Sequence, residues 1–254
     1  MSFSVAAEHY DRFMGRYSVP LAERFADFAG VGHGQRVLDV GCGPGALTQK
    51  LIERLGPDAV AAVDPSESFV TAVRGRLPGV SVTRASAEEL PFEDRSFDAA
   101  LAQLVVQFMA DPVAGLREMG RVTRPGGTVA ACVWDHATGR GPLSPLWDAA
   151  RELDAEVEDE SSRPGVRPGH LAELFDAAGL GDVQDGVITV EVRHPSFEQW
   201  WEPFTLGVGT AGAYVATLDQ RQRDRLRESC KRRLPQPPFT LSASARATRG
   251  VASG

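Results

Sequence analysis

The chain has 254 residues, of which 43% are hydrophobic and 24% charged, which is ordinary for a globular protein with one well-buried domain. Its net charge of −7 argues against non-specific nucleic-acid binding, and no apolar run is long enough for a transmembrane helix. The N-terminus lacks a signal-peptide pattern, and the three cysteines (Cys42, Cys132 and Cys230) lie far apart. We therefore expect a cytoplasmic protein without membrane contact, disulfide or metal site.

Between Arg36 and Val133, short apolar runs alternate with amphipathic segments of helical spacing, a pattern typical of a parallel α/β sheet. The predicted strands start at Val37 and then cover Ala59–Val63, Val80–Ala85, Phe97–Val106 and Thr128–Val133. The predicted helices are Ala46–Leu55, Ser66–Leu77 and one that begins at Pro112 with Asp111 as its cap.

After Trp134 the alternation becomes less regular. The predicted elements are helices Leu143–Val157 and His170–Ala178, strand Val183–Val192, a largely helical region Pro195–Leu234 and strand Phe239–Arg249. Apolar and polar residues alternate strictly in the last strand, which predicts one wet face, and the tail Val251–Gly254 is predicted to be disordered. Seven basic residues between Arg221 and Arg233 indicate a solvated helix face with intrahelical ion pairs.

The segment Val37–Gly45, with the sequence VLDVGCGPG, is the strongest functional signal. A strand that ends in an acid and a glycine-rich turn opens onto the carboxyl edge of a parallel sheet, where ligands bind. Gly41, Gly43 and Gly45 let the backbone turn tightly and approach a ligand. The segment predicts a site for a nucleotide-derived cofactor.

The glycine pattern alone fits two cofactors. GCGPGA matches the dinucleotide fingerprint with Ala46 in the last place, and Asp64 at the end of the next strand suits a ribose hydroxyl in either case. The longer string RVLDVGCGPGALT resembles the first motif of the class I S-adenosylmethionine (SAM)-dependent methyltransferases, with Asp39 in the acidic position. In that family the acid lies near the amino-acid end of the cofactor, whereas a pyrophosphate would gain nothing from it. The resemblance favours SAM.

Further segments resemble the same family in the same order. AVDPSESFV resembles the second motif, which implies that Asp64 accepts hydrogen bonds from both ribose hydroxyls and that Pro65 or Ser66 lies against the adenine. RASAEELPFEDRSFDAAL resembles the third and fourth motifs, which implies that Ala87 and Glu88 address the adenine amino group. LPFEDRSFD and LREMGRVTRPGGTVAACVW are similar to segments of the UbiE-like "type 11" branch.

The resemblance implies a Rossmann-like α/β fold: a seven-stranded, mostly parallel sheet of order 3-2-1-4-5-7-6, with the last strand antiparallel and helices on both faces. Residues 1–254 would form a single domain, in which residues 36–134 are the SAM-binding core and residues 239–249 the final strand. Residues 135–167 and 194–238 would be helical insertions over the carboxyl edge, on the acceptor side.

Residues 1–30 would form a helical cap. Its segment YDRFMGRYS resembles the part that folds over the cofactor in this branch, which implies contacts from Tyr10 and Arg16; alternatively, Phe13 and Tyr17 only pack a helix onto the domain. Gln103, at the end of the fourth strand, is expected beside the methionine portion. The predicted cofactor-binding residues are Tyr10, Arg16, Asp39, Gly41, Cys42, Gly43, Asp64, Pro65, Ser66, Ala87, Glu88 and Gln103.

SAM-dependent methylation mainly needs alignment of the nucleophile and exclusion of water, and only some acceptors need a general base. Gln107 stands where relatives often have a histidine, and the N/D-P-P-Y/F motif of the adenine and glutamine amino-group methyltransferases is missing. His136 is the best-placed candidate base, against the alternative of an exposed histidine without a role. The tryptophans either line an apolar acceptor pocket or anchor the insertions: Trp134, Trp147, Trp200 and Trp201. No catalytic residue is assigned.

The leading hypothesis is a SAM-dependent methyltransferase that acts on a small apolar or aromatic molecule and releases S-adenosylhomocysteine (SAH). One alternative is a protein that binds SAM without turnover. A less favoured one is an NAD-dependent dehydrogenase, for which the Tyr-x-x-x-Lys pair is missing. The sequence names neither the acceptor, nor the methylated atom, nor the oligomeric state.

Overall fold

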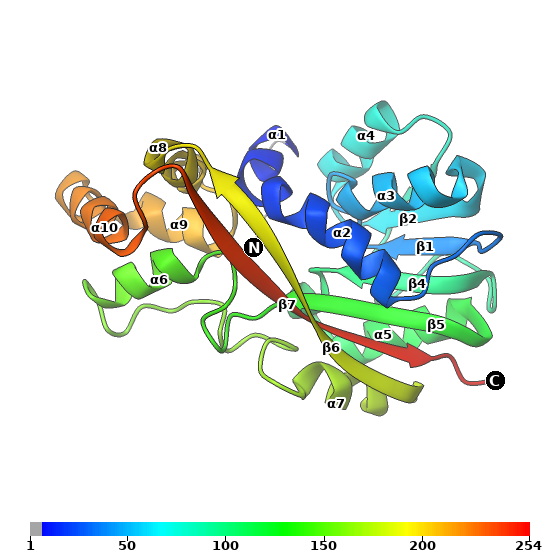
Figure 1. Cartoon of the computed structure of the whole chain (residues 1–254). Coiled ribbons are helices and arrows are strands. Elements are labelled where there is room, and N and C mark those ends of the chain that lie inside the picture. Colours follow the sequence, from blue (N-terminus) through cyan, green and yellow to red (C-terminus); the bar gives the residue numbers. More distant parts are fainter. Residues whose placement is uncertain (1–6) are drawn as a thin grey trace.

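A computed structural model describes residues 7–254, so the first six residues of the predicted cap lie outside the described part. One seven-stranded sheet of order β3-β2-β1-β4-β5-β7-β6 forms its centre (Figure 1). The strands are β1 (Val37–Val40), β2 (Val60–Asp64), β3 (Ser81–Arg84), β4 (Phe97–Gln103), β5 (Thr123–Trp134), β6 (Gly181–His194) and β7 (Phe239–Val251). The strands β1 to β5 pair in parallel, and β7 is antiparallel to both β5 and β6. The predicted fold class, including the strand order, is confirmed.

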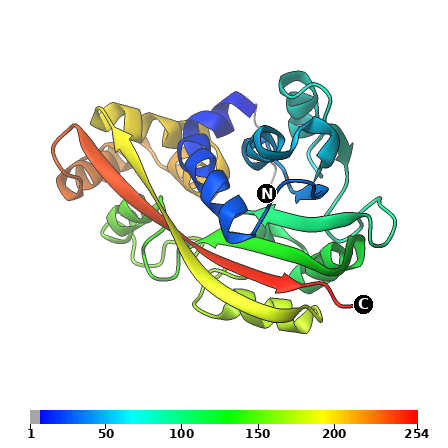
Figure 2. The same ribbon diagram turned by 45° about the vertical axis from the view of Figure 1, so that its right-hand side comes forward.

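Helices cover both faces of the sheet (Figures 1 and 2). On one face lie α2 (Arg16–Phe28), α3 (Ala46–Leu55) and α4 (Glu67–Arg76), and on the other lie α5 (Pro112–Val122) and α7 (His170–Ala177). Every residue of β1 and β2 is buried, as in parallel strands with helices on both sides. Asp111 caps α5 as expected, because its carboxylate accepts the N–H of Ala114 at 3.0 Å.

Two boundaries differ from the predictions for clear physical reasons. β4 stops at Gln103 rather than at Val106 because Leu104 has a φ of +63°, which an extended strand cannot continue. The prediction of a disordered tail is wrong: Val251 belongs to β7, and Ala252 is buried and exchanges two backbone hydrogen bonds with Gly126 and Gly127.

The last strand also lacks the predicted wet face along its centre. Ser244 and Thr248 are buried, and they bond to side chains of β6, namely Thr189 and Asp185. Hydroxyl groups can be buried in a sheet when a neighbouring strand satisfies them, which an alternating pattern alone does not reveal.

The two insertions form a helical group beyond the carboxyl ends of the parallel strands, at the left of Figure 1. Its helices are α6 (Ser144–Arg151), α8 (Phe197–Trp201), α9 (Gly209–Thr217) and α10 (Gln220–Arg233). The predicted helix Leu143–Val157 is shorter and ends at Arg151. Of the ion pairs predicted within α10, that between Arg227 and Glu228 is found at 3.4 Å, and α10 also forms ion pairs with other segments. Arg227 and Arg233 of α10 pair with Glu198 and Glu152, which lie on other segments, so the basic helix attaches to its neighbours.

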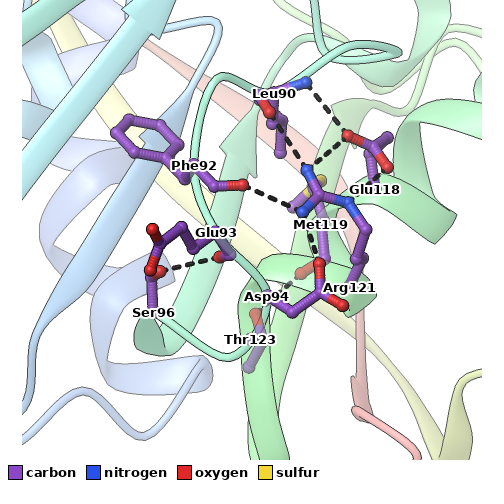
Figure 3. A network of polar contacts seen from close by, with 9 residues as sticks. All are labelled: Leu90, Phe92, Glu93, Asp94, Ser96, Glu118, Met119, Arg121 and Thr123. Atoms are coloured by element: carbon purple, nitrogen blue, oxygen red, sulfur yellow. Dashed lines mark hydrogen bonds and ion pairs between the residues drawn. The ribbon is translucent and has the colours of Figure 1, made fainter.

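Arg121 at the end of α5 holds the turn between β3 and β4 (Figure 3). Its guanidinium donates to the backbone oxygens of Leu90 (3.0 Å) and Phe92 (2.9 Å), and it forms ion pairs with Asp94 and Glu118 at 2.7 Å each. Glu118 in turn accepts the N–H of Leu90 at 3.0 Å. The planar fork of arginine meets four acceptors at once, which a lysine cannot do. This network fixes the start of β4 against α5.

We expect the substitution Arg121→Met to lower the free energy of unfolding by about 2 kcal/mol, because it leaves two carbonyls and two carboxylates without their charged donor. Urea denaturation followed by circular dichroism measures the change. Arg117→Met is the matched control, since Arg117 is exposed on the same helix and its loss should cost less than about 0.5 kcal/mol. Equal stability of the two variants would contradict the role assigned to Arg121.

Candidate cofactor site

A cavity of about 400 Å³ opens at the carboxyl ends of β1, β2 and β4, a size common for small-molecule sites. The loops after these strands form one side, and the N-terminal helical segment and the insertions form the other. Eleven of the twelve predicted cofactor-binding residues line it: Tyr10, Asp39, Gly41, Cys42, Gly43, Asp64, Pro65, Ser66, Ala87, Glu88 and Gln103. The remaining one, Arg16, lies elsewhere.

The glycine loop depends on backbone conformations that side chains disfavour. Gly41 has a φ of +71°, and a Cβ there would lie 2.5 Å from Cγ2 of Val105. Gly43 has a φ of +53°, and a Cβ there would meet nothing within 4 Å, so the open space beside it belongs to the cavity. The first glycine is therefore needed for packing, and the second leaves room for a ligand.

Asp64 links the loop after β1 to the loop after β2. One carboxylate oxygen accepts the N–H of Gly43 and the other accepts the N–H of Ser66, each at 2.8 Å. The side chain is buried, and burial raises the pKa of this carboxyl although the two N–H groups counteract the rise. A carboxylate oxygen has lone pairs beyond one hydrogen bond, so Asp64 can still accept from ligand hydroxyls.

Asp39 lies deeper in the cavity wall, at only 1% exposure. Its carboxylate accepts a hydrogen bond of 2.6 Å from the hydroxyl of Thr48 on α3. Burial raises the pKa of Asp39 to about 7, the Thr48 hydroxyl opposes the rise, and the negative charge of Asp64 adds to it. Asp39 therefore changes its charge close to neutral pH, and a cation beside it would favour the ionised form.

Two further predicted residues, Glu88 and Tyr10, lie at the rim of the cavity. Glu88 accepts the backbone N–H of Ala110 at 2.8 Å, which connects the loop after β3 to the segment before α5. Tyr10 stands edge-on to Phe69 of α4 with 5.6 Å between the ring centroids. Burial and the charge of Asp64 raise the pKa of Tyr10 to about 12, so the phenol stays protonated. These aromatic rings give the rim an apolar wall.

The structure does not bring Arg16 to the cavity. Its guanidinium donates to the carbonyl oxygen of Gln199 at 2.8 Å and to that of Arg12, and it lines a separate surface groove. Tyr17 is buried beside it and shares a 3.0 Å hydrogen bond with Nε2 of His194. Arg16 and Tyr17 thus join the N-terminal helix to β6 and α8. A local sequence motif could not reveal this, because Gln199 lies 183 residues after Arg16 and His194 lies 177 residues after Tyr17.

Phe13 and Met14 line the cavity from the helical segment ahead of α2, and contact of this segment with the cofactor stays a prediction. The segment packs onto the domain through Tyr17, and it also covers the cavity through Tyr10, Phe13 and Met14. Tyr10, Phe13 and Met14 stand at positions i, i+3 and i+4, so a helix places their side chains on one side. This spacing is visible in the sequence.

The far end of the cavity is formed by the strand ends and the insertions. Trp134 at the end of β5, His136 just beyond it, Gln107 and Glu160 all line it. The expectation of an exposed His136 is wrong, because the ring is half-buried and burial lowers its pKa to about 4. Nothing in the sequence marks Glu160 as a cavity residue, because it ends an acidic run of the kind that is typical of a solvated loop. In the structure it is only 5% exposed.

Three of the four tryptophans anchor the insertions. Trp147 packs on Tyr214 of α9, and Trp200 and Trp201 pack on Phe204. Only Trp134 lines the cavity.

In the described part of the chain, no three histidine, cysteine, aspartate or glutamate side chains are grouped to hold a metal ion. No helix between residues 7 and 254 has the length and hydrophobicity to span a bilayer.

Comparison with known proteins finds relatives for the part of the chain that surrounds this cavity. Residues 38–131 match the family model of the methyltransferase domain. An uncharacterized methyltransferase of Mycobacterium bovis is 38% identical over 135 residues, which are 53% of this chain and 52% of that protein. A demethylmenaquinone methyltransferase of a Mycobacterium species is 41% identical over 111 residues, which are 44% of this chain and 46% of that protein. The chain thus spans about half the length of these curated relatives.

Solved structures resemble nearly the whole chain at low sequence identity. The YcgJ protein of Bacillus subtilis has a TM-score of 0.58 at 18% identity, and the match covers 94% of this chain and 99% of that one. A phosphoethanolamine N-methyltransferase of Haemonchus contortus, solved with SAH, has a TM-score of 0.59 at 18% identity, covering 98% of this chain and 57% of that one. Residues 38–131 therefore match the methyltransferase-domain family, and the chain shares the Rossmann-like fold of these solved methyltransferase structures.

Proposed function

We propose that this protein is a SAM-dependent methyltransferase that acts on a small molecule. The observation that carries the proposal is the charge of the cavity. Four carboxylates line it, from Asp39, Asp64, Glu88 and Glu160, and no lysine or arginine of residues 7–254 does so. SAM carries a positive sulfonium, a positive ammonium and one carboxylate, so its net charge is positive, and a wall of one sign attracts a ligand of the opposite net charge.

The backbone of the glycine loop supports the same cofactor over a dinucleotide. A pyrophosphate is bound by backbone N–H groups that point at it from a glycine loop and a helix N-terminus. Here the N–H groups of Gly41 and Cys42 donate to Val63, that of Gly43 to Asp64 and that of Gly45 to Cys42. These N–H groups already donate to acceptors within the protein and do not point at a pyrophosphate. This disfavours an NAD-dependent dehydrogenase.

The residues present fit the parts of SAM, which supplies a methyl group on a positively charged sulfur when bound. Asp64 would accept the ribose hydroxyls, and Glu88 with the backbone at Ala87 would hold the adenine amino group. Asp39 and Gln103 would hold the ammonium group. The amide nitrogen of Gln103 donates to Ser18 at 3.1 Å, which leaves its buried oxygen without a partner among the described residues. A buried acceptor without a donor is costly, and an ammonium would satisfy it.

The acceptor would bind at the far end of the same cavity. Phe13, Leu143 and Val208 make this end apolar, which favours an acceptor with an apolar or aromatic body. The helical cap and the insertions enclose it and would exclude water from the reacting groups. Methyl transfer from a sulfonium mainly requires that the nucleophile is aligned with the methyl group and that water is excluded, because the leaving group is neutral.

Calorimetric titration of the protein with SAH, with NAD as the control, tests the cofactor. We expect micromolar binding of SAH and none of NAD, and the reverse result would refute the proposal. Transfer from tritiated SAM to a panel of small amines, alcohols, thiols and phenols then separates a methyltransferase from a protein that only binds SAM. A pure binder would label no member of the panel.

The substitution Asp64→Ala is expected to weaken SAH binding by about 1–3 kcal/mol, because the ribose hydroxyls lose their charged acceptor and the two loops lose their link. Calorimetry gives the dissociation constant of each variant. Asp58→Ala, at an exposed aspartate ahead of β2, is the control and should bind SAH as the unmodified protein does. An unchanged constant for Asp64→Ala would exclude Asp64 from the site.

The affinity for SAH is also expected to depend on pH through Asp39. Its pKa of about 7 means that the carboxyl is largely neutral below neutral pH, so binding of the ammonium must displace a proton there. Displacement of one proton makes affinity rise by up to about tenfold per pH unit as pH increases towards 7, and level off above it. The raised pKa of Asp64 would add a rise of the same sign.

Titrations between about pH 5.5 and 8.5, in buffers of different ionisation enthalpy, measure both the affinity and the proton released. The variant Asp39→Asn should bind more weakly and show a flatter profile. A steep rise that persists in this variant would assign the pH dependence to another group.

A further inference from the structure

Glu160 differs from the other three carboxylates of the cavity in its position. Asp39, Asp64 and Glu88 follow β1, β2 and β3, where the cofactor is proposed to bind, whereas Glu160 lies in the insertion between α6 and α7. It is 5% exposed, and its Oε2 has no hydrogen-bond partner among the described residues. An acidic side chain that is buried in this way needs a ligand or a proton to offset its loss of hydration.

The nearby charged side chains do not neutralise Glu160. Asp159, its neighbour, forms an ion pair with Arg151 and accepts the N–H of Ser161. The guanidinium of Arg163 lies 5.3 Å from the ring centre of Phe108, and the backbone N–H of Arg163 donates to the carbonyl oxygen of Glu160. Burial raises the pKa of the Glu160 carboxyl, and its own backbone N–H and the nearby donors of Thr210 and Trp147 partly oppose this.

The other polar groups at this end are mostly hydrogen-bond acceptors as well. The amide nitrogen of Gln107 donates to the carbonyl oxygen of Leu104 at 3.0 Å, which fixes the orientation of the amide. Its Oε1 is then buried without a partner among the described residues. His136 is neutral at physiological pH because burial lowers its pKa to about 4. The donors on this side are the indole N–H of Trp134 and the hydroxyl of Thr210.

We propose that Glu160, together with Gln107, recognises the methyl acceptor, and that the acceptor is an uncharged or cationic molecule that donates an N–H or O–H from an apolar body. This inference rests on the proposed function. A carboxylate or phosphate on the acceptor would face Glu160 without a lysine or arginine from the cavity wall to balance it, so anionic acceptors are disfavoured. The apolar walls from Phe13, Leu143 and Val208 would take the rest of the molecule.

Three probes of similar size test this selectivity: 2-phenylethylamine, 2-phenylethanol and 3-phenylpropanoate, each titrated into the protein saturated with SAH. We expect the amine and the alcohol to bind and the anion to bind at least about tenfold more weakly, because like charges repel in a buried site. The titration with SAH itself reports on the proposed function separately, so the two proposals can fail independently. Binding of the anion as tightly as the amine, or binding of none of the three, would overturn the inference.

The variant Glu160→Gln keeps the size of the side chain and removes the charge. Its affinity for the amine should fall at least about tenfold, and the amine should lose its advantage over the anion. Glu158→Gln, at an exposed position two residues earlier in the same loop, is the matched control and should leave the selectivity unchanged. An unchanged affinity of the amine for Glu160→Gln would overturn the assignment of Glu160. Thermal unfolding of each variant checks that it is folded, and the selectivity of the unmodified protein remains a test without any variant.

Discussion

The buried carboxylate of Asp64 is the contact on which the cofactor end of this cavity depends. Gly41 and Cys42 donate to the carbonyl oxygen of Val63, and Gly43 donates to the side chain of Asp64, so three consecutive N–H groups hold the glycine loop against the end of β2. The other oxygen of Asp64 accepts from Ser66 and so sets the start of α4. One side chain therefore positions both loops, and the backbone donors offset the cost of burying its charge.

The parts of the structure that the sequence predicted are those set by local chemistry. A strand that ends in Asp39, followed by glycines at 41, 43 and 45, restricts the chain to one kind of turn at one edge of a sheet. The position of Asp64 at the end of the next strand then follows from the parallel order. The strand order, which the family resemblance implies, is confirmed, and eleven of the twelve residues predicted to bind the cofactor line one cavity.

The predictions failed where distant segments decide the outcome. Arg16 binds the carbonyl oxygen of Gln199, and Glu160 is buried because the insertions close over it. Neither contact has a periodic or local signal in the sequence. Charge patterns show the same limit, because the acidic residues up to Glu160 and the basic residues of α10 are both typical of solvated segments. In the folded chain, Glu160 lines the cavity, and Arg227 and Arg233 form ion pairs with residues of other segments.

The order of strands at the edge of the sheet has a consequence for how the chain reaches this structure. β7, the last strand in the sequence, lies between β5 and β6, so β6 has no neighbour in the sheet until β7 has been added. His194, to which Tyr17 of the N-terminal helix bonds, is the final residue of β6. The N-terminal helix therefore packs on β6, a strand that joins the sheet only through its pairing with β7. Contacts between segments so far apart close large loops, and such topologies fold more slowly than those built from local contacts. During synthesis, the cavity can become complete only after β7 has left the ribosome.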